Sequence, residues 1–307
     1  MAMREYLVGE VAEEYAEGLL SRREAVRRLG LLGVGLPGAT ALLAACGGDD
    51  DDDATQAPPA TPTGPVAPAA TPPPGKDVGK LITYTANGQR FRAAYKAAAK
   101  PKAAVLVIHE NKGLTTHFFE LVGRMAANGY SALCVDLLSR EGKDGLAGFD
   151  DQAAATAALS AMPAEQLLGD LKSGVDELLE RAGDDLKLGA MGFCFGGGMT
   201  WNLLQKGPGQ ERRLRAAIPF YGPAPANPDF TGSKAAVLGM YAGEDERVNG
   251  TRAAAEAALK AAKLTYEIKV WDGAQHAFFN DTGERYDETA ATAAQKQLLA
   301  WFDKHLT

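Results

Sequence analysis

The chain has 307 residues, 46% of them hydrophobic and 23% charged, a composition that excludes a collagen-like or wholly disordered protein. Its 32 Lys and Arg residues and 39 Asp and Glu residues give a formal net charge of −7, so nothing suggests a nucleic-acid partner, which would need a basic face. The three cysteines are spread singly, which is too few for a disulfide scaffold and gives no metal-ligand spacing.

Residues 1–46 have the pattern of an export signal. Arg22-Arg23 and Arg27-Arg28 precede an uncharged stretch, residues 29–45, that is rich in Leu, Gly and Ala and ends in small residues. The paired arginines resemble the twin-arginine signal, although Ala25 stands where that signal usually has Phe. Leu43-Ala44-Ala45-Cys46 resembles a bacterial lipobox, in which the cysteine is lipidated.

We therefore expect an exported lipoprotein of a bacterial cell envelope, anchored to the periplasmic or outer face of a membrane through Cys46. Two alternatives stay open: plain cleavage of the signal, and an uncleaved helix that spans the membrane, for which residues 29–45 are short. Residues 47–77 contain five consecutive aspartates and then many Pro, Ala and Thr residues, a composition that predicts a solvated tether. The aspartates lack the glycine-turned loop of a calcium site, so we expect no metal there.

From residue 78 to the end of the chain, strand-like and helix-like segments alternate. Residues 81–85 and 91–95 flank Asn87-Gly88, which predicts a hairpin. The continuous apolar run at residues 103–108 predicts a buried strand, and residues 131–138 predict another. Further strands are predicted at residues 186–191, 216–220, 236–241 and 266–271. Apolar residues at helical spacing predict helices around residues 118–125, 167–179, 251–262 and 288–305. This alternation predicts a single α/β domain over residues 78–307 with a doubly wound, mostly parallel sheet.

The segment Gly192-Phe193-Cys194-Phe195-Gly196 follows one of these strands and precedes a helix. It is a nucleophile elbow with sulfur in place of oxygen, in which the glycines permit a sharp turn. The turn also puts Cys194 at a helix N-terminus, where the helix dipole favours the thiolate. The alternative is an inert buried cysteine.

An acid and a histidine follow later strands in the order that α/β-hydrolases use for their triads, nucleophile, then acid, then base. Asp245 lies in a turn after the strand at 236–241, and His276 lies in a glycine-containing loop after the strand at 266–271. Chain order favours Asp245 as the carboxylate that orients the histidine. Three other acids remain rivals for this role: Glu244, Asp136 and Asp272.

The segment His109-Glu110-Asn111 follows the strand at 103–108. In this kind of site the oxyanion hole combines a backbone N–H after that strand with the N–H of the residue after the nucleophile, which assigns Asn111 and Phe195. Glu110 would place a carboxylate beside the thiol; the alternative is a salt-bridged residue at the rim.

Together these residues resemble the dienelactone hydrolase family, over about residues 81–305. The motifs that carry the resemblance are Val107-Ile108-His109-Glu110-Asn111-Lys112-Gly113-Leu114, Val135-Asp136-Leu137-Leu138-Ser139-Arg140, Gly192-Phe193-Cys194-Phe195-Gly196-Gly197, Tyr241-Ala242-Gly243-Glu244-Asp245 and His276-Ala277-Phe278-Phe279-Asn280. The resemblance implies an α/β-hydrolase fold and a triad of Cys194, Asp245 and His276. It also implies that Glu110 holds the resting thiol until a substrate displaces it.

Family members that act on dienelactone hold the substrate carboxylate with arginines, which makes Arg140 and Arg285 candidates. Each could equally form a surface ion pair. One family arginine stands shortly after the catalytic histidine, where this chain has Asn280-Asp281. Tyr221 either lines the pocket or packs beneath it.

We expect a monomeric, cysteine-dependent hydrolase that cleaves a small ester or lactone through a thioester and needs no metal or organic cofactor. An exported thioesterase or other acyl hydrolase could use the same triad. A binding lipoprotein that keeps the fold without turnover is a further alternative.

Overall fold

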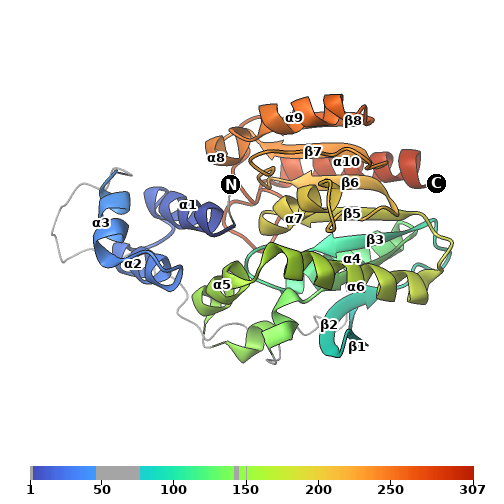
Figure 1. The fold of residues 1–307 in the computed structure, drawn as a ribbon, viewed down its shortest axis with the longest axis horizontal. Helices are drawn as coiled ribbons and strands as arrows, with labels where there is room; N and C mark the ends of the chain where they lie inside the picture. Colours follow the sequence, from blue (N-terminus) through green and yellow to red (C-terminus); the bar gives the residue numbers. More distant parts are fainter. Residues whose placement is uncertain (1–2, 46–76, 142–144, 150) are drawn as a thin grey trace.

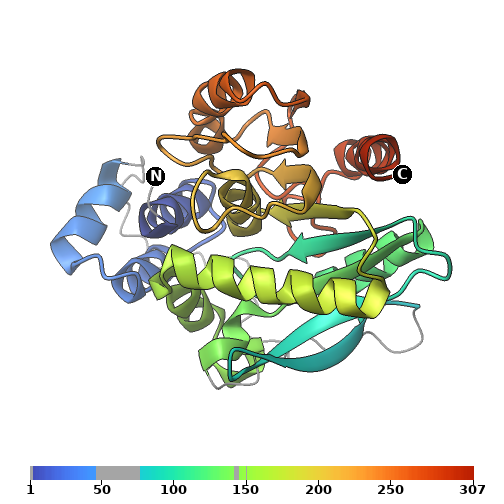
Figure 2. The same ribbon diagram turned by 45° about the vertical axis from the view of Figure 1, so that its right-hand side comes forward.

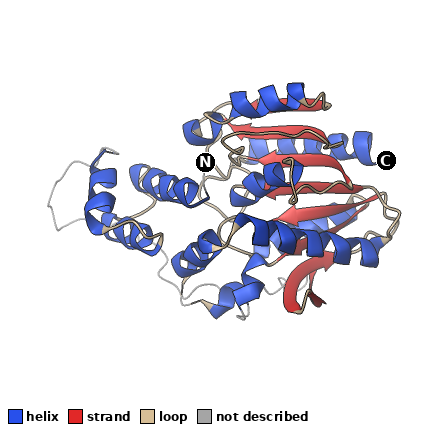
Figure 3. Cartoon of the chain, in the orientation of Figure 1, coloured by secondary structure: helices blue, strands red, loops and turns tan. Residues whose placement is uncertain are grey.

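A computed structural model describes residues 3–45, 77–141, 145–149 and 151–307. Its centre is an eight-stranded sheet in the order β1-β2-β4-β3-β5-β6-β7-β8 (Figures 1 and 3). The strands are β1 (Lys80–Ala86), β2 (Gln89–Lys96), β3 (Ala103–Ile108), β4 (Tyr130–Val135), β5 (Leu188–Phe193), β6 (Leu214–Phe220), β7 (Ala236–Ala242) and β8 (Tyr266–Trp271). β1 pairs with β2 and β2 with β4 in antiparallel fashion, and all other neighbours are parallel.

Helices cover both faces of the sheet, with α6 and α7 on one face and α4 and α10 on the other (Figures 1 and 2). The helices of this domain are α4 (Thr116–Ala127), α5 (Gln152–Ala161), α6 (Ala164–Ala182), α7 (Phe195–Leu204), α8 (Glu246–Asn249), α9 (Arg252–Ala261) and α10 (Glu288–Leu306), with short 3-10 helices η1 (Leu137–Glu141) and η2 (Gly145–Gly148). The predicted doubly wound α/β fold is thus confirmed. Because β3 and β5 to β8 run parallel, the loops that follow them meet at one edge of the sheet.

Local chemistry explains most of these elements. β3 and β4 lie in the middle of the sheet, and every residue of both strands is buried, as their continuous apolar runs predicted. Asn87 and Gly88 have φ values of 51° and 73°, the left-handed backbone of a two-residue hairpin turn. β4 ends at Val135, earlier than predicted, because Leu137 and Leu138 belong to η1 although both are buried.

Three further helices precede the sheet: α1 (Met3–Ala16), α2 (Arg22–Leu31) and α3 (Leu36–Ala45). They pack together: α1 and α2 contact α5, α1 lies next to α7, and α3 lies on the outer side of α1 and α2 (Figures 1 and 2). Ser21 caps α2, since its hydroxyl accepts a hydrogen bond from the amide of Glu24. The pattern of residues 1–46 predicted only an export signal, whereas in the structure α1 buries Tyr6 and Leu7 in the core of the molecule.

No helix within the described part of the chain is both long and apolar enough to cross a membrane. Cys46 and nearly all of the predicted tether, residues 46–76, lie outside the described residues.

Candidate active site

Cys194 occupies a strained turn between β5 and α7. Its φ of 56° and ψ of −117° are values that a side-chain-bearing residue rarely adopts, and such strain marks functional turns. The turn is held on both sides, because the Cys194 amide donates to the Phe220 carbonyl and the Cys194 carbonyl accepts from the Gly198 amide, each at 3.1 Å. The predicted elbow geometry is therefore present, with the thiol only 2% exposed.

The glycines on either side of Cys194 let α7 approach the sheet. A Cβ atom on Gly192 would lie 2.1 Å from the Gly196 carbonyl oxygen, and one on Gly196 would lie 2.3 Å from the Ile108 carbonyl oxygen. Both contacts are with backbone, which cannot swing aside as a side chain could. Glycine at these positions is thus a packing requirement of the elbow.

The Gly196→Ala substitution is expected to lower the free energy of unfolding by at least about 2 kcal/mol, because the added methyl group overpacks the junction of β3 and α7. The matched control is Gly169→Ala, since a Cβ on this exposed helical glycine has no neighbour within 4 Å. The control is expected to stabilise the protein by about 0.5–1 kcal/mol, through the higher helix propensity of alanine. Chemical denaturation checks both values, and equal effects would contradict the packing requirement.

His276 and Asp245 form a buried pair at the same edge of the sheet. His276 Nδ1 donates to Asp245 Oδ2 at 2.5 Å, while Asp245 Oδ1 accepts from the Val248 amide at 3.0 Å and so caps α8. Ala277, which follows the histidine, has a φ of 63°. Among the described residues, none of the rival acids Glu244, Asp136 and Asp272 bonds His276, so the geometry favours Asp245 as the orienting carboxylate.

In this pair each residue stabilises the charged form of the other. Burial raises the pKa of Asp245, but the charge and hydrogen bond of His276 and the bond from Val248 outweigh it, so that the pKa lies below its usual value. Burial likewise lowers the pKa of His276, but Asp245 and then Cys194 raise it well above the usual value. The pKa of the Cys194 thiol is raised by burial and by Glu10, with His276 opposing, which favours the neutral thiol.

Two residues of α1 lie directly on the nucleophile. The Tyr6 hydroxyl is 3.1 Å from Cys194 Sγ and 3.4 Å from His276 Nε2, and both Glu10 carboxylate oxygens are 3.6 Å from Sγ. Neither residue was predicted from the sequence. They precede the predicted domain by some seventy positions, and no local motif marks them.

Glu110 has partners other than the thiol. Its Oε2 accepts from Asn280 Nδ2 at 2.8 Å, and its Oε1 accepts from the Tyr221 hydroxyl at 3.4 Å. In the structure Glu10 stands beside Sγ and Glu110 bonds Asn280 and Tyr221, so the implied role of Glu110 in holding the resting thiol stays a prediction. Tyr221 packs rather than lines the cleft, because it is fully buried with its ring 5.2 Å from that of His276.

Asn111 and Phe195, the predicted oxyanion-hole donors, follow β3 and begin α7. His109 fixes the loop that carries Asn111, since its Nδ1 donates to the Glu110 carbonyl at 2.7 Å and its Nε2 accepts from the Leu137 amide at 3.2 Å. Burial lowers the pKa of His109 to about 4, so the ring is neutral and keeps both bonds. Neither Asn111 N–H nor Phe195 N–H has a hydrogen-bond partner among the described residues, which leaves both available to a substrate oxygen.

A cleft of about 290 Å³ opens on Cys194, His276, Glu110 and Asn111. Arg285 lines this cleft, but its guanidinium bonds the Glu17 carboxylate of α1, with Nε at 2.8 Å. The other arginine candidate does not reach the cleft. Arg140 Nε lies 3.1 and 2.9 Å from the two carboxylate oxygens of buried Asp170, so the expectation that it binds a substrate is corrected to a structural ion pair.

The sequence pattern of the Dienelactone hydrolase family matches residues 91–306, which contain the elbow, the acid and the histidine. The chain belongs to this family. It is therefore a hydrolase, with the α/β-hydrolase fold. The matched region excludes α1 to α3, so Tyr6 and Glu10 are additions to the family domain.

Several relatives of this family member are similar over nearly their whole length. A protein of Salmonella typhi that is provisionally named a carboxymethylenebutenolidase is 30% identical, over 78% of this chain and 95% of its own. A provisionally named carboxymethylenebutenolidase of Saccharolobus solfataricus is 29% identical, over 72% of this chain and 97% of its own. The crystal structure of a provisionally named dienelactone hydrolase from Klebsiella pneumoniae superposes with a TM-score of 0.63 at 29% identity, covering 74% of this chain and 98% of that one.

Proposed function

We propose that this family member hydrolyses a small ester or lactone through a thioester on Cys194. The observation that carries the proposal is the chain of contacts from Asp245 to His276 to the strained elbow, all at the edge of the sheet where the cleft opens. The names of the relatives, carboxymethylenebutenolidase and dienelactone hydrolase, support a lactone or ester as the substrate class.

The first half of the reaction forms the thioester. The Cys194 thiol gives its proton to His276 Nε2, and the resulting thiolate attacks the carbonyl carbon of the substrate. The oxyanion that develops is stabilised by the N–H groups of Asn111 and Phe195. The C–O bond then breaks, and the leaving alkoxide or enolate takes the proton from His276.

The second half releases the acid. His276, now neutral, accepts a proton from water, and the hydroxide attacks the thioester carbonyl. The C–S bond breaks, and the thiolate takes the proton back from His276. Asp245 stays ionised throughout and stabilises the transient imidazolium. The sum of both halves is ester plus water giving acid plus alcohol.

The test is to trap the thioester. A His276→Ala variant can still be acylated slowly by the activated ester 4-nitrophenyl acetate but lacks the base that activates water. Peptide mass spectrometry is expected to find the acyl group on Cys194, and hydroxylamine is expected to remove it, as it does for thioesters. An acyl group on another residue would argue against the proposal. Dienelactone, a simple ester and an acyl thioester are then compared as substrates of the wild type.

We also propose that residues 1–46 export the protein and that Cys46 carries a lipid anchor at the cell envelope. The sequence pattern supports this, and Arg22 and Arg23 are exposed at the start of α2, where a receptor could read them. The test expresses the full chain in a bacterial host with labelled palmitate. Wild type is expected to be labelled and membrane-bound, and Cys46→Ala unlabelled. Retention of Arg22→Lys/Arg23→Lys in the cytoplasm would identify the arginine pair as the export determinant, whereas normal export of that variant would count against it.

A further inference from the structure

We propose that α1 is an inhibitory segment that covers the nucleophile and occupies the place of the substrate. The inference rests on the proposed function only in taking Cys194 as the reacting group. It concerns residues 3–16, which lie outside the part of the chain that matches the family.

The covering contact involves both reacting groups of the site. The Tyr6 hydroxyl lies against Cys194 Sγ and His276 Nε2 together, at 3.1 and 3.4 Å. Glu10 lies one turn further along the same helix, and its carboxylate contacts the thiol. Tyr6 is 1% exposed and Glu10 6%, so the helix places both side chains in the interior. Although Cys194 borders the cleft, these groups leave it only 2% exposed and stand in the path of a carbonyl carbon to Sγ.

The same contact disfavours the reactive form of the thiol. Four groups face Sγ: Tyr6 and Glu10 from α1, His276 from the loop after β8 and Glu110 from the loop after β3. Burial and Glu10 raise the pKa of the thiol, and only His276 opposes them. Tyr6 also stands at His276 Nε2, the nitrogen that must receive the thiol proton. The helix thus covers the site and also disfavours the thiolate form of its nucleophile.

Space lies on both sides of the helix. The cleft on Cys194 and His276 is bordered by Glu10, while a second cavity, of about 570 Å³, is bordered by Tyr6 and by Met199 of α7. Tyr6 links the two spaces, because it borders the second cavity while its hydroxyl contacts Cys194 in the first. We infer that α1 fills the middle of one longer groove.

Ion pairs at the rim hold α1 in the groove. Arg247 lies over the Tyr6 ring, 4.3 Å from its centroid, and its Nη2 bonds Glu13 at 3.1 Å. Arg285 bonds Glu17 at the other end of the contact. Such partly exposed pairs are individually weak, so the helix can be released by local changes.

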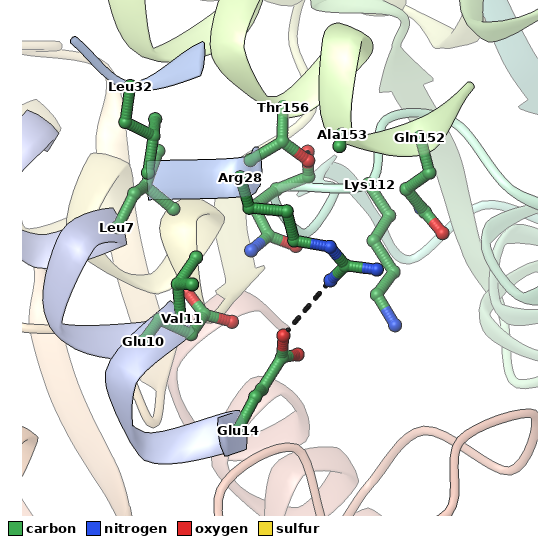
Figure 4. Close-up of a pocket in the computed structure, with 11 residues that line it drawn as sticks. Leu7, Glu10, Val11, Glu14, Arg28, Leu32, Lys112, Gln152, Ala153 and Thr156 are labelled. Carbon is green, nitrogen blue, oxygen red and sulfur yellow. Dashed lines mark hydrogen bonds and ion pairs between the residues drawn. The ribbon is translucent and has the colours of Figure 1, made fainter. Parts of the chain in front are cut away.

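The N-terminal helices also pair with one another at the edge of the cleft. Figure 4 shows Glu14 of α1 reaching Arg28 of α2, a pair 3.1 Å apart, with Lys112 and Gln152 of the hydrolase domain beside them. α2 in turn pairs with the domain through Arg27 and Asp151. The hydrolase domain supplies its own nucleophile, base, acid and oxyanion donors, so nothing in the proposed reaction requires α1. These features favour a cover over a working part of the site.

The experiment measures the rate at which iodoacetamide alkylates Cys194 in the full chain. The variant Glu13→Arg/Glu17→Arg turns two attractive rim pairs into repulsive ones and leaves the buried contacts unchanged. Alkylation of Cys194, followed by peptide mass spectrometry, is expected to accelerate at least about tenfold. The matched control Glu5→Arg reverses a charge at an exposed position of the same helix and is expected to leave the rate near that of wild type.

Cys134 is the internal control, because it is a free, fully buried cysteine of β4. Its alkylation is expected to stay slow in every variant, and a rise would reveal general unfolding. If the rim variant unfolds, Tyr6→Ala/Glu10→Ala tests the same point by removing the covering groups themselves. A Cys194 rate that stays at the wild-type value in folded variants of both kinds would overturn the proposal.

Hydrolysis of 4-nitrophenyl acetate distinguishes two roles for α1, an inhibitory cover and a catalytic part of the site. The kcat/KM of Glu13→Arg/Glu17→Arg is expected to rise along with the alkylation rate. Faster alkylation together with slower hydrolysis would mean that α1 completes a working site, and would overturn the inhibitory role. Faster alkylation with no hydrolysis in any variant, and no acyl group trapped on Cys194, would support the cover while removing the proposed hydrolase chemistry.

Discussion

The Cys194→Ala variant is expected to lose at least about three orders of magnitude in kcat/KM for any ester that the wild type hydrolyses. The reason is that no other group at the elbow can form the acyl-enzyme. The substitution removes one buried sulfur atom and relieves no backbone strain, so the fold is expected to survive. Loss of dienelactone absorbance and release of 4-nitrophenol are the two measurements.

The effect of Cys194→Ala on activity must be measured in two parent proteins, because α1 covers Cys194 in the wild-type chain. Cys194→Ala is therefore compared with its parent both in the wild type and in Glu13→Arg/Glu17→Arg. The loss is expected to be larger in the second background, where the parent is more active. Activity that persists in Cys194→Ala while its unfolding midpoint matches wild type would exclude Cys194 as the nucleophile.

Asp245→Asn is expected to lower kcat/KM by about 10³- to 10⁴-fold through the tautomer of His276. The side chain of asparagine keeps the shape of aspartate, and its oxygen can still accept from the Val248 amide, which keeps the cap of α8. Its amide group then faces Nδ1 and donates to it. The proton of the imidazole moves to Nε2, which can no longer accept the thiol proton.

Two measurements check this explanation. At a pH above the raised pKa of His276, where the ring is neutral, its nitrogen chemical shifts are expected to report the Nε2–H tautomer in Asp245→Asn and the opposite tautomer in wild type. The unfolding midpoint is expected to change little. Glu244→Gln, a neighbouring acid that does not bond His276 in the structure, is the matched control and is expected to keep wild-type activity. A similar loss in both variants would mean that the turn, not the tautomer, matters.

The sheet was predictable because burial on both faces leaves a clear trace in the sequence. β3 begins and ends where its apolar run predicted, and β7 ends one residue later. β8 also has the predicted bounds, although it is an edge strand and none of its residues is buried. The end of β4 was wrong because Leu137 and Leu138 are as apolar as the strand, although the backbone has already turned into η1. An apolar residue indicates that a position is buried, but it does not indicate whether the backbone there is still a strand.

The elbow, acid and histidine were predictable in position for a topological reason. Each follows a parallel strand, and such strand ends converge at one edge of the sheet. Partners were harder to predict than positions. Glu110 was expected on the thiol, but its bonds to Asn280 and Tyr221 come from loops more than 100 positions away. Tyr6 and Glu10 reach Cys194 across more than 180 positions, and a contact of that range leaves no local pattern to read.

The position of α1 also bears on the chemical lifetime of the nucleophile. Peroxides convert a thiolate to sulfenic acid and then to the irreversible sulfinic acid, and they need both access to the sulfur and its deprotonated form. In the structure the sulfur is 2% exposed and lies under Tyr6, and its pKa is raised by burial and by Glu10. A chain on its way to an oxidising compartment would thus carry its nucleophile in a reduced, sheltered state. The helix that suppresses turnover would serve at the same time as an antioxidant shield.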